Sequence, residues 1–208
     1  MDIQYKKLAD YLNMVIKERG LIIIAIDGPG GSGKSYFSDN LNRHLHKCQI
    51  IHFDDFYLES DSECHTSSEI GSSFDWTRLE SEVLIPLKKE KKAFYRKYDW
   101  IEDKVIGNYE VIPEGIIIIE GVYSSRIELR DYYDYKIWVE ADYQLRLNRG
   151  IERDGDEMRE KWEEEWMPKE IKYIASKIHN PRENADIIIH GNSGDCKSFN
   201  MLKTKICF

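Results

Sequence analysis

The strongest constraint on the fold of this chain is an apolar run that ends in a glycine-rich turn. Residues 21–26 are all apolar, and residues 28–35 read Gly-Pro-Gly-Gly-Ser-Gly-Lys-Ser. A short apolar run closed by turn residues is typical of a strand buried on both faces. Apolar and aromatic side chains then recur at the spacing of one helix face, at Tyr36, Phe37, Leu41 and Leu45. The sequence therefore predicts a strand, a glycine-rich loop and a helix in direct succession.

The glycine-rich segment matches G-x-x-x-x-G-K-[ST], the phosphate-binding loop of nucleoside triphosphate enzymes, at every specified position. Glycines let backbone N–H groups approach a phosphate, and the start of the helix adds free donors. Lys34 would supply a positive charge for the outer phosphates, and Ser35 a hydroxyl for Mg²⁺. A glycine-rich turn without a ligand is the alternative, and the flanking elements disfavour it. The residues expected to bind ATP are Gly28, Gly30, Gly31, Ser32, Gly33, Lys34 and Ser35.

Composition indicates a globular protein with one domain. The chain has 208 residues, of which 41% are hydrophobic and 33% charged, and its net charge of −8 disfavours a nucleic-acid binder. The longest apolar run is too short to span a membrane. Scattered cysteines and a charged N-terminus predict a cytoplasmic location. We expect a single domain over residues 1–191 and a polar, loosely held tail over 192–208.

Further patterns predict an α/β fold with a doubly wound, five-stranded parallel sheet. An amphipathic helix is expected over 2–19. Between the later apolar runs, apolar residues recur at helical spacing, so helices are expected there as well. Strand-like runs flanking Gly107 and Asn108 predict a hairpin excursion over about 93–112. The strands expected after the first lie at 49–53, 116–119, 135–139 and 186–189.

Three acidic residues follow predicted strands, at the edge of the sheet where ligands gather in such folds. They are Asp27, Asp54 and Glu120. Acids often end strands because turns are polar, but three beside a phosphate loop favour a site. We expect Glu120 to help Ser35 hold Mg²⁺. Asp54 is the better candidate for a general base, since Phe56 and Tyr57 could form the wall of a substrate pocket.

A second group of charged residues is expected on a lid over about residues 149–168. Helical spacing places Arg146, Arg149 and Arg153 on one side, within reach of a common anion. Guanidinium groups stabilise the charge of a transferring phosphoryl group, which makes Arg149 and Arg153 candidate catalytic residues. The alternative is a solvated face of surface ion pairs. Trp162 and Trp166 fit core or lid packing better than ligand contacts.

Between Leu21 and Gly191 the chain resembles the uridine kinase family of P-loop kinases, which includes phosphoribulokinase and pantothenate kinase. The phosphate loop is shared with many families, so the specific likeness lies in five shorter segments. These are Asp54-Asp55-Phe56-Tyr57, Phe74-Asp75-Trp76, Tyr98-Asp99-Trp100, Glu120-Gly121, and Arg149 with Arg153-Asp154.

The resemblance implies an ATP- and Mg²⁺-dependent kinase that phosphorylates a small molecule. The acceptor it favours is the 5′-hydroxyl of uridine or of a similar nucleoside. The resemblance also implies that Asp54 is the base, that Asp75 holds sugar hydroxyls, and that Tyr98 and Trp100 face the nucleobase. Tyr57, as a residue of the pocket wall, is a further candidate for substrate contact. The chain departs from the family's pattern after Trp100 and after Asp154. Another acceptor, such as pantothenate, a sugar or a drug-like alcohol, therefore stays open. So do a non-catalytic ATP-binding switch and a homo-oligomeric assembly.

Overall fold

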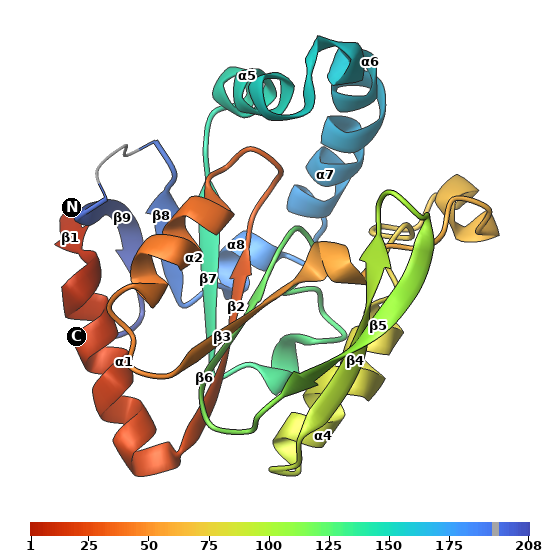
Figure 1. The fold of residues 1–208 in the computed structure, drawn as a ribbon. Coiled ribbons are helices and arrows are strands. Elements are labelled where there is room, and N and C mark those ends of the chain that lie inside the picture. The colour runs from red at the N-terminus through yellow and green to blue at the C-terminus, as the bar shows by residue number, and fades with distance from the viewer. Residues whose placement is uncertain (193–195) are drawn as a thin grey trace.

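The computed structural model describes residues 1–192 and 196–208, and its centre is a seven-stranded sheet in the order β1-β9-β8-β7-β2-β6-β3 (Figure 1). Five neighbouring strands are parallel, as the sequence predicts: β8 (Ile187–His190), β7 (Tyr135–Glu140), β2 (Leu21–Asp27), β6 (Gly115–Glu120) and β3 (Cys48–His52). Two antiparallel strands extend the sheet beyond β8, namely β9 (Ser198–Thr204) and β1 (Asp2–Gln4).

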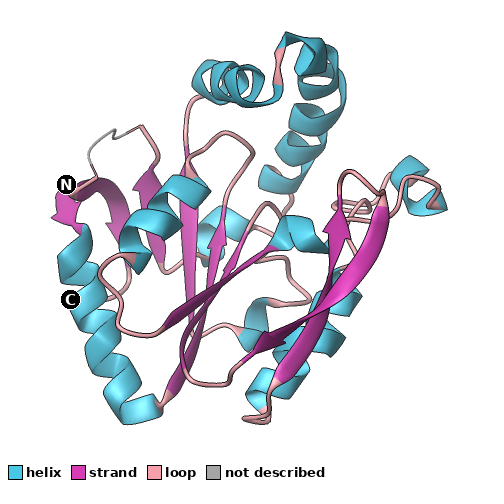
Figure 2. Cartoon of the chain, in the orientation of Figure 1, coloured by secondary structure: helices cyan, strands magenta, loops and turns pink. Residues whose placement is uncertain are grey.

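The two central strands are apolar over residues 21–26 of β2 and 116–119 of β6, because both faces of the sheet are covered there (Figure 2). In β2, Ile22, Ile24 and Ile26 pack into one core, whereas Ile23 and Ala25 pack into the other. This alternation follows from the two-residue period of a strand. The first core lies under α1 (Tyr5–Arg19) and α2 (Lys34–Asn42).

The second core is covered by helices that come later in the chain and by a hairpin. One continuous helical segment comprises α3 (Trp76–Leu79), a wider turn at 80–84 and α4 (Ile85–Lys88), and the hairpin consists of β4 (Ala93–Asp99) and β5 (Lys104–Val111). Beyond the carboxyl ends of the parallel strands lies an arch of helices (Figure 1). Its members are α5 (Tyr143–Asp154), α6 (Arg159–Lys161) and α7 (Met167–Ile174), and the short α8 (Pro181–Asn184) follows.

Three expectations on secondary structure were wrong. The first helix begins at Tyr5, because residues 2–4 pair with β9 as strand β1. The tail is not loosely held. Its described part contains β9, and Phe199 on this strand is only 1% exposed and packs against Tyr5 and Phe37.

The hairpin turns at residues 100–103 rather than at Gly107 and Asn108. The strand pairing skips between Tyr95 and Lys97, so that two residues of β5 face one residue of β4. Gly107 has a φ of +82°, which is typical of such a β-bulge. The glycine thus bends a strand that continues, and the turn is stabilised by the Asp99 carboxylate, which accepts from the backbone N–H groups of residues 101 and 102.

Among the described residues, no helix combines the length and the apolar character needed to cross a membrane.

Candidate active site

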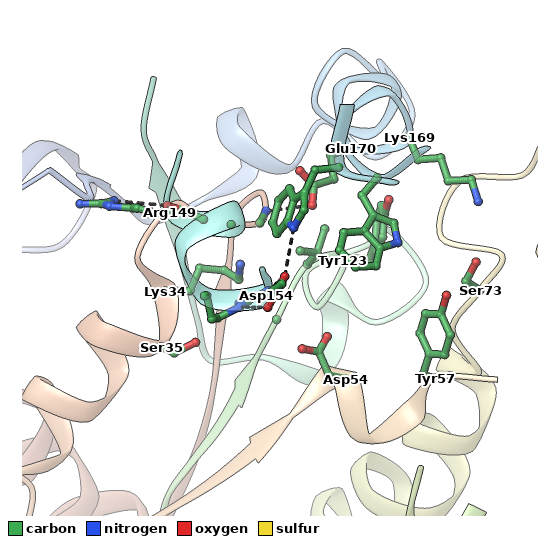
Figure 3. A pocket seen from close by; sticks show the side chains of 18 of the residues that line it. Lys34, Ser35, Asp54, Tyr57, Ser73, Tyr123, Arg149, Asp154, Lys169 and Glu170 are labelled. Atoms are coloured by element: carbon green, nitrogen blue, oxygen red, sulfur yellow. Dashed lines mark hydrogen bonds and ion pairs between the residues drawn. The ribbon is translucent and has the colours of Figure 1, made fainter. Parts of the chain in front are cut away.

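A cavity of about 910 Å³ opens beyond the carboxyl ends of β2, β3 and β6 (Figure 3). The phosphate loop forms one side of it, and the lid helices α5, α6 and α7 cover it. The described residues that line it include Lys34, Ser35, Asp54, Tyr57, Trp100, Glu120, Arg149 and Arg153. The topology therefore brings together most of the predicted site, from residues more than a hundred positions apart.

The phosphate loop has the conformation that its glycines allow. Gly33 has a φ of +96° and directly precedes α2, so the first N–H groups of this helix point toward the loop. Gly28 cannot be replaced, because a Cβ there would lie 2.0 Å from the carbonyl oxygen of Val139. Gly30, Gly31, Gly33, Lys34 and Ser35 line the cavity, whereas Gly28 and Ser32 do not. These last two lie in the packed base of the loop.

Lys34 is held inside the loop. The residue is 7% exposed, and its Nζ donates to the carbonyl oxygen of Pro29 at 3.1 Å. A lysine held by one backbone oxygen can exchange that bond for a phosphate oxygen with little movement. The position therefore fits the charge-supplying role predicted for it.

Asp27, the first of the three strand-end acids, is fully buried and does not line the cavity. Its carboxylate accepts five hydrogen bonds of 2.6–3.1 Å, from the N–H of Gly28, Tyr123 and Ser125 and the hydroxyls of Ser125 and Tyr173. Burial raises the pKa of Asp27, and the hydrogen bonds oppose this rise. The residue ties the loop after β6 and helix α7 to β2, so it is not free to bind a metal.

Replacing Asp27 by alanine is expected to lower the free energy of unfolding by about 4 kcal/mol, because several buried donors lose their acceptor at once. Chemical denaturation of the wild-type and variant proteins measures this change. Asp10→Ala, which removes an exposed ion pair with Lys6, is the control and should change stability by less than about 0.5 kcal/mol. Similar values for the two variants would contradict this structural role of Asp27.

Asp54 and Glu120 lie beside the phosphate loop, as predicted. Asp54 is exposed to the cavity at a tight turn formed by Phe53–Phe56, and the walls of the cavity desolvate its carboxylate in part. This desolvation raises the pKa of Asp54, the charge of Glu120 adds to the rise, and the charges of Lys34 and Arg153 oppose it. A carboxylate that has a raised pKa, feels the charges of these cations and opens into the cavity suits a general base.

Glu120 is the last residue of β6 and is 4% exposed. Its Oε2 lies 2.9 Å from Nδ1 of His52, and this hydrogen bond raises the pKa of His52. No sequence motif indicates His52, which the pairing of β3 with β6 places opposite Glu120. Ser35 and Glu120 both line the cavity, and their hydroxyl and carboxylate oxygens are of the kind that Mg²⁺ prefers, so these two residues could hold the ion.

The arginines do not converge on one anion. Arg146 is buried and bonds the carbonyl oxygen of Gly30 and the carboxylate of Glu170, so its expected role toward a common anion was wrong. Arg149 donates to the carbonyl oxygen of Gly31 at 3.2 Å. Arg153 forms a two-pronged ion pair with Asp154 at 2.6 and 2.9 Å. Arg149 and Arg153 line the cavity, and their catalytic roles remain predictions.

An aromatic wall faces the phosphate loop across the cavity. Tyr57 and Trp100 lie 4.7 Å apart between ring centroids, and Phe74, Tyr123 and Trp166 also line the cavity. The lid tryptophans pack edge to face at 5.2 Å, with Trp162 buried. Tyr123 and Trp166 are pocket residues that the sequence did not predict, although the Trp-x-x-x-Trp spacing was a usable signal for the tryptophan.

Two predicted substrate residues lie outside the lining. Asp75 caps the N-terminus of α3, where its carboxylate accepts from the N–H of Arg78 at 3.0 Å and from Thr77 Oγ1 at 2.7 Å. Tyr98 packs behind Trp100 and donates its hydroxyl to Asp103 at 2.6 Å. Local polar partners thus already engage both side chains, and direct substrate contacts by them remain predictions.

A parallel sheet, a phosphate loop that leads into a helix, a cavity acid after the second parallel strand and an arginine-bearing lid together define a P-loop kinase. Proteins of this class transfer a phosphoryl group from a nucleoside triphosphate to an acceptor. The model of the phosphoribulokinase / uridine kinase family matches residues 23–193, and the chain belongs to this family.

A curated relative agrees with this placement, and solved structures of lower identity share the fold. The uridine kinase of Latilactobacillus sakei is 26% identical over 204 residues, which cover 93% of this chain and 96% of the relative. A structure described as a possible uridine kinase from Bacillus stearothermophilus superposes with a TM-score of 0.61 at 20% identity, covering 88% and 98% of the two chains. A D-glycerate 3-kinase from Cryptococcus neoformans shares the fold with a TM-score of 0.53 at 15% identity, covering 82% and 84%.

Proposed function

We propose that this kinase phosphorylates the 5′-hydroxyl of uridine or of a similar nucleoside. The observation that carries the proposal is the position of Asp54 between the phosphate loop and the aromatic wall. A planar base can pack against Tyr57 and Trp100, since aromatic faces stack on one another. A ribose hydroxyl would then lie near Asp54. The uridine kinases among the relatives support the same choice.

In the proposed reaction the hydroxyl oxygen attacks the γ-phosphorus of ATP, and its proton passes to the Asp54 carboxylate. The bond between the γ-phosphorus and the bridging oxygen breaks, which leaves ADP. Lys34 and the loop N–H groups hold the phosphates, and Arg153 stabilises the charge that moves outward. Mg²⁺, held through Ser35 and Glu120, would neutralise phosphate charge. The lid excludes water, which would otherwise compete with the acceptor.

A kinase of the same fold with another acceptor is the second candidate. It is favoured by the state of two residues that the sequence predicts as nucleoside contacts. Tyr98 is bonded to Asp103, and Asp75 caps a helix, so both side chains already have partners within the protein. The D-glycerate 3-kinase among the structural neighbours acts on a different acceptor on this fold. The two candidates differ in the acceptor alone.

A screen for ADP release with Mg·ATP tests both candidates, using nucleosides, pantothenate, sugars, D-glycerate and aminoglycosides. Turnover with uridine or cytidine well above the rate without acceptor would support the nucleoside proposal. Turnover only with another alcohol would replace it by the second candidate. If the folded protein binds ATP and turns over none of the acceptors, the proposal fails, and the alternative of a non-catalytic ATP-binding switch gains support.

Arg153→Ala is expected to lower kcat about 10²-fold while weakening ATP binding less, because its contact should strengthen as charge develops in the transition state. Steady-state kinetics together with ATP titration separate the two effects. The matched control is Arg159→Ala, a lid arginine that pairs with Asp156 and does not line the cavity. Equal losses in both quantities for Arg153→Ala would indicate uniform binding instead.

A further inference from the structure

Gly30 of the phosphate loop is held on both of its backbone polar groups by one ion pair. Its N–H donates to Glu170 Oε1 at 2.9 Å, and its carbonyl oxygen accepts from Arg146 Nε at 3.0 Å. Arg146 Nη2 also donates to Glu170 Oε2 at 2.6 Å, which closes a ring of three contacts. The Arg146 and Glu170 side chains are only 5% and 8% exposed. We refer to Gly30, Arg146 and Glu170 together as the Gly30 clamp.

The clamp fixes which way the loop N–H groups point. A trans peptide is planar, so the carbonyl of one residue and the N–H of the next point in opposite directions. Arg146 draws the Gly30 carbonyl toward α5, and the N–H of Gly31 therefore points away from α5. Arg149 holds the carbonyl of Gly31 in the same way, at 3.2 Å. The two arginines thus orient successive peptide groups of the loop.

The clamp also joins two lid helices to the loop. Arg146 lies on α5 and Glu170 on α7, 24 positions apart in the sequence. Trp162 seals the junction, because a Cβ on Gly30 would lie 2.9 Å from its ring and a Cβ on Gly150 would lie 2.4 Å from it. Lid position and loop shape are therefore set by the same contacts.

A carboxylate beside a phosphate site would normally repel the ligand. Here burial raises the pKa of Glu170, while the charge of Arg146 and the Gly30 N–H oppose that rise. Both carboxylate oxygens already accept hydrogen bonds within the clamp. A buried acid with both oxygens engaged by the loop and its neighbour is suited to positioning rather than to proton transfer.

We propose that Glu170 and Arg146 are positioning residues that hold Gly30 and so shape the phosphate loop for nucleotide binding. They act through the loop backbone and not on the acceptor. The proposal rests on the P-loop kinase class of the chain and is independent of which alcohol it phosphorylates.

The test measures the dissociation constant for ADP by calorimetry, which needs no acceptor and no turnover. Glu170→Ala should weaken ADP binding about tenfold, since the loss of one organising hydrogen bond corresponds to about 1.4 kcal/mol. Glu170→Gln should stay within about threefold of wild type, because its amide oxygen can still accept from Gly30. Glu164→Ala, which removes a solvent-exposed acid of the same lid, is the matched control and should bind ADP normally.

Arg146→Lys keeps the charge opposite Glu170, but a single ammonium group cannot span both partners as the guanidinium fork does. Arg146→Lys should therefore also weaken ADP binding. This second variant keeps the proposal testable if Glu170→Ala does not fold. For each folded variant, steady-state kinetics should show a raised KM for ATP and an unchanged KM for the acceptor. Wild-type affinity for ADP in folded Glu170→Ala or Arg146→Lys would overturn the proposal. A similar rise in both KM values would also overturn it, because that result would indicate general damage.

Discussion

Asp54→Asn is expected to lower turnover about 10²–10⁴-fold, the usual range for losing a general base. This corresponds to about 3–5 kcal/mol of barrier. The Asp54 carboxylate opens into the cavity beside Lys34 and Arg153, whose charges act on it. Asparagine has a similar shape but cannot take the proton from the acceptor hydroxyl. The measurement is the steady-state rate with the best acceptor from the screen, and ATP affinity without Mg²⁺ should be nearly unchanged.

The neighbouring acid provides a matched control. Asp55 lies in the same turn, but its carboxylate pairs with Lys97 at 3.1 Å and accepts from the Tyr95 hydroxyl at 3.3 Å, and it does not line the cavity. Asp55→Asn should therefore keep most of the activity. If Asp54→Asn retained wild-type turnover while Asp55→Asn lost it, the base would have to be assigned to Asp55.

The pH dependence gives a second readout for Asp54. Desolvation and the charge of Glu120 raise its pKa above the ordinary value of 3.8. A base must be deprotonated to act, so kcat/KM should fall as the pH drops through this raised pKa. The acidic limb of the wild-type profile should lie above the ordinary range of aspartate, and the residual activity of Asp54→Asn should lack that limb. A profile unchanged in the variant would assign the limb to another group.

Lys34→Ala is expected to reduce turnover by about 10²–10³-fold or more, because the only cation inside the loop is lost where phosphate charge develops. The fold should survive, since within the part of the chain that the structure describes the Nζ bonds only the backbone oxygen of Pro29. Lys34→Met, which keeps the apolar stem, separates the charge from the packing and should lose as much activity. Normal turnover in either folded variant, with melting temperatures close to wild type, would contradict the phosphate-site assignment.

The strands and the loop were predictable because their signals are local. Residues 21–26 alternate between two buried cores, and such a strand needs an apolar residue at every position. The hairpin shows the limit of local signals. Gly107 indicated a turn, but the same positive φ serves a bulge, and only the pairing of Tyr95 with Tyr109 distinguishes the two.

The same division holds for the candidate site. The sequence by itself determined the phosphate loop, Ser35 and the strand-end positions of Asp54 and Glu120, because each depends on the backbone geometry of a few consecutive residues. Only the tertiary structure decided which polar side chains are left for a ligand. The Asp27 carboxylate accepts a hydrogen bond from the hydroxyl of Tyr173, 146 positions away, and Arg146 forms an ion pair with Glu170. A buried charged group must be paired, and its partner comes from whichever element the fold brings alongside.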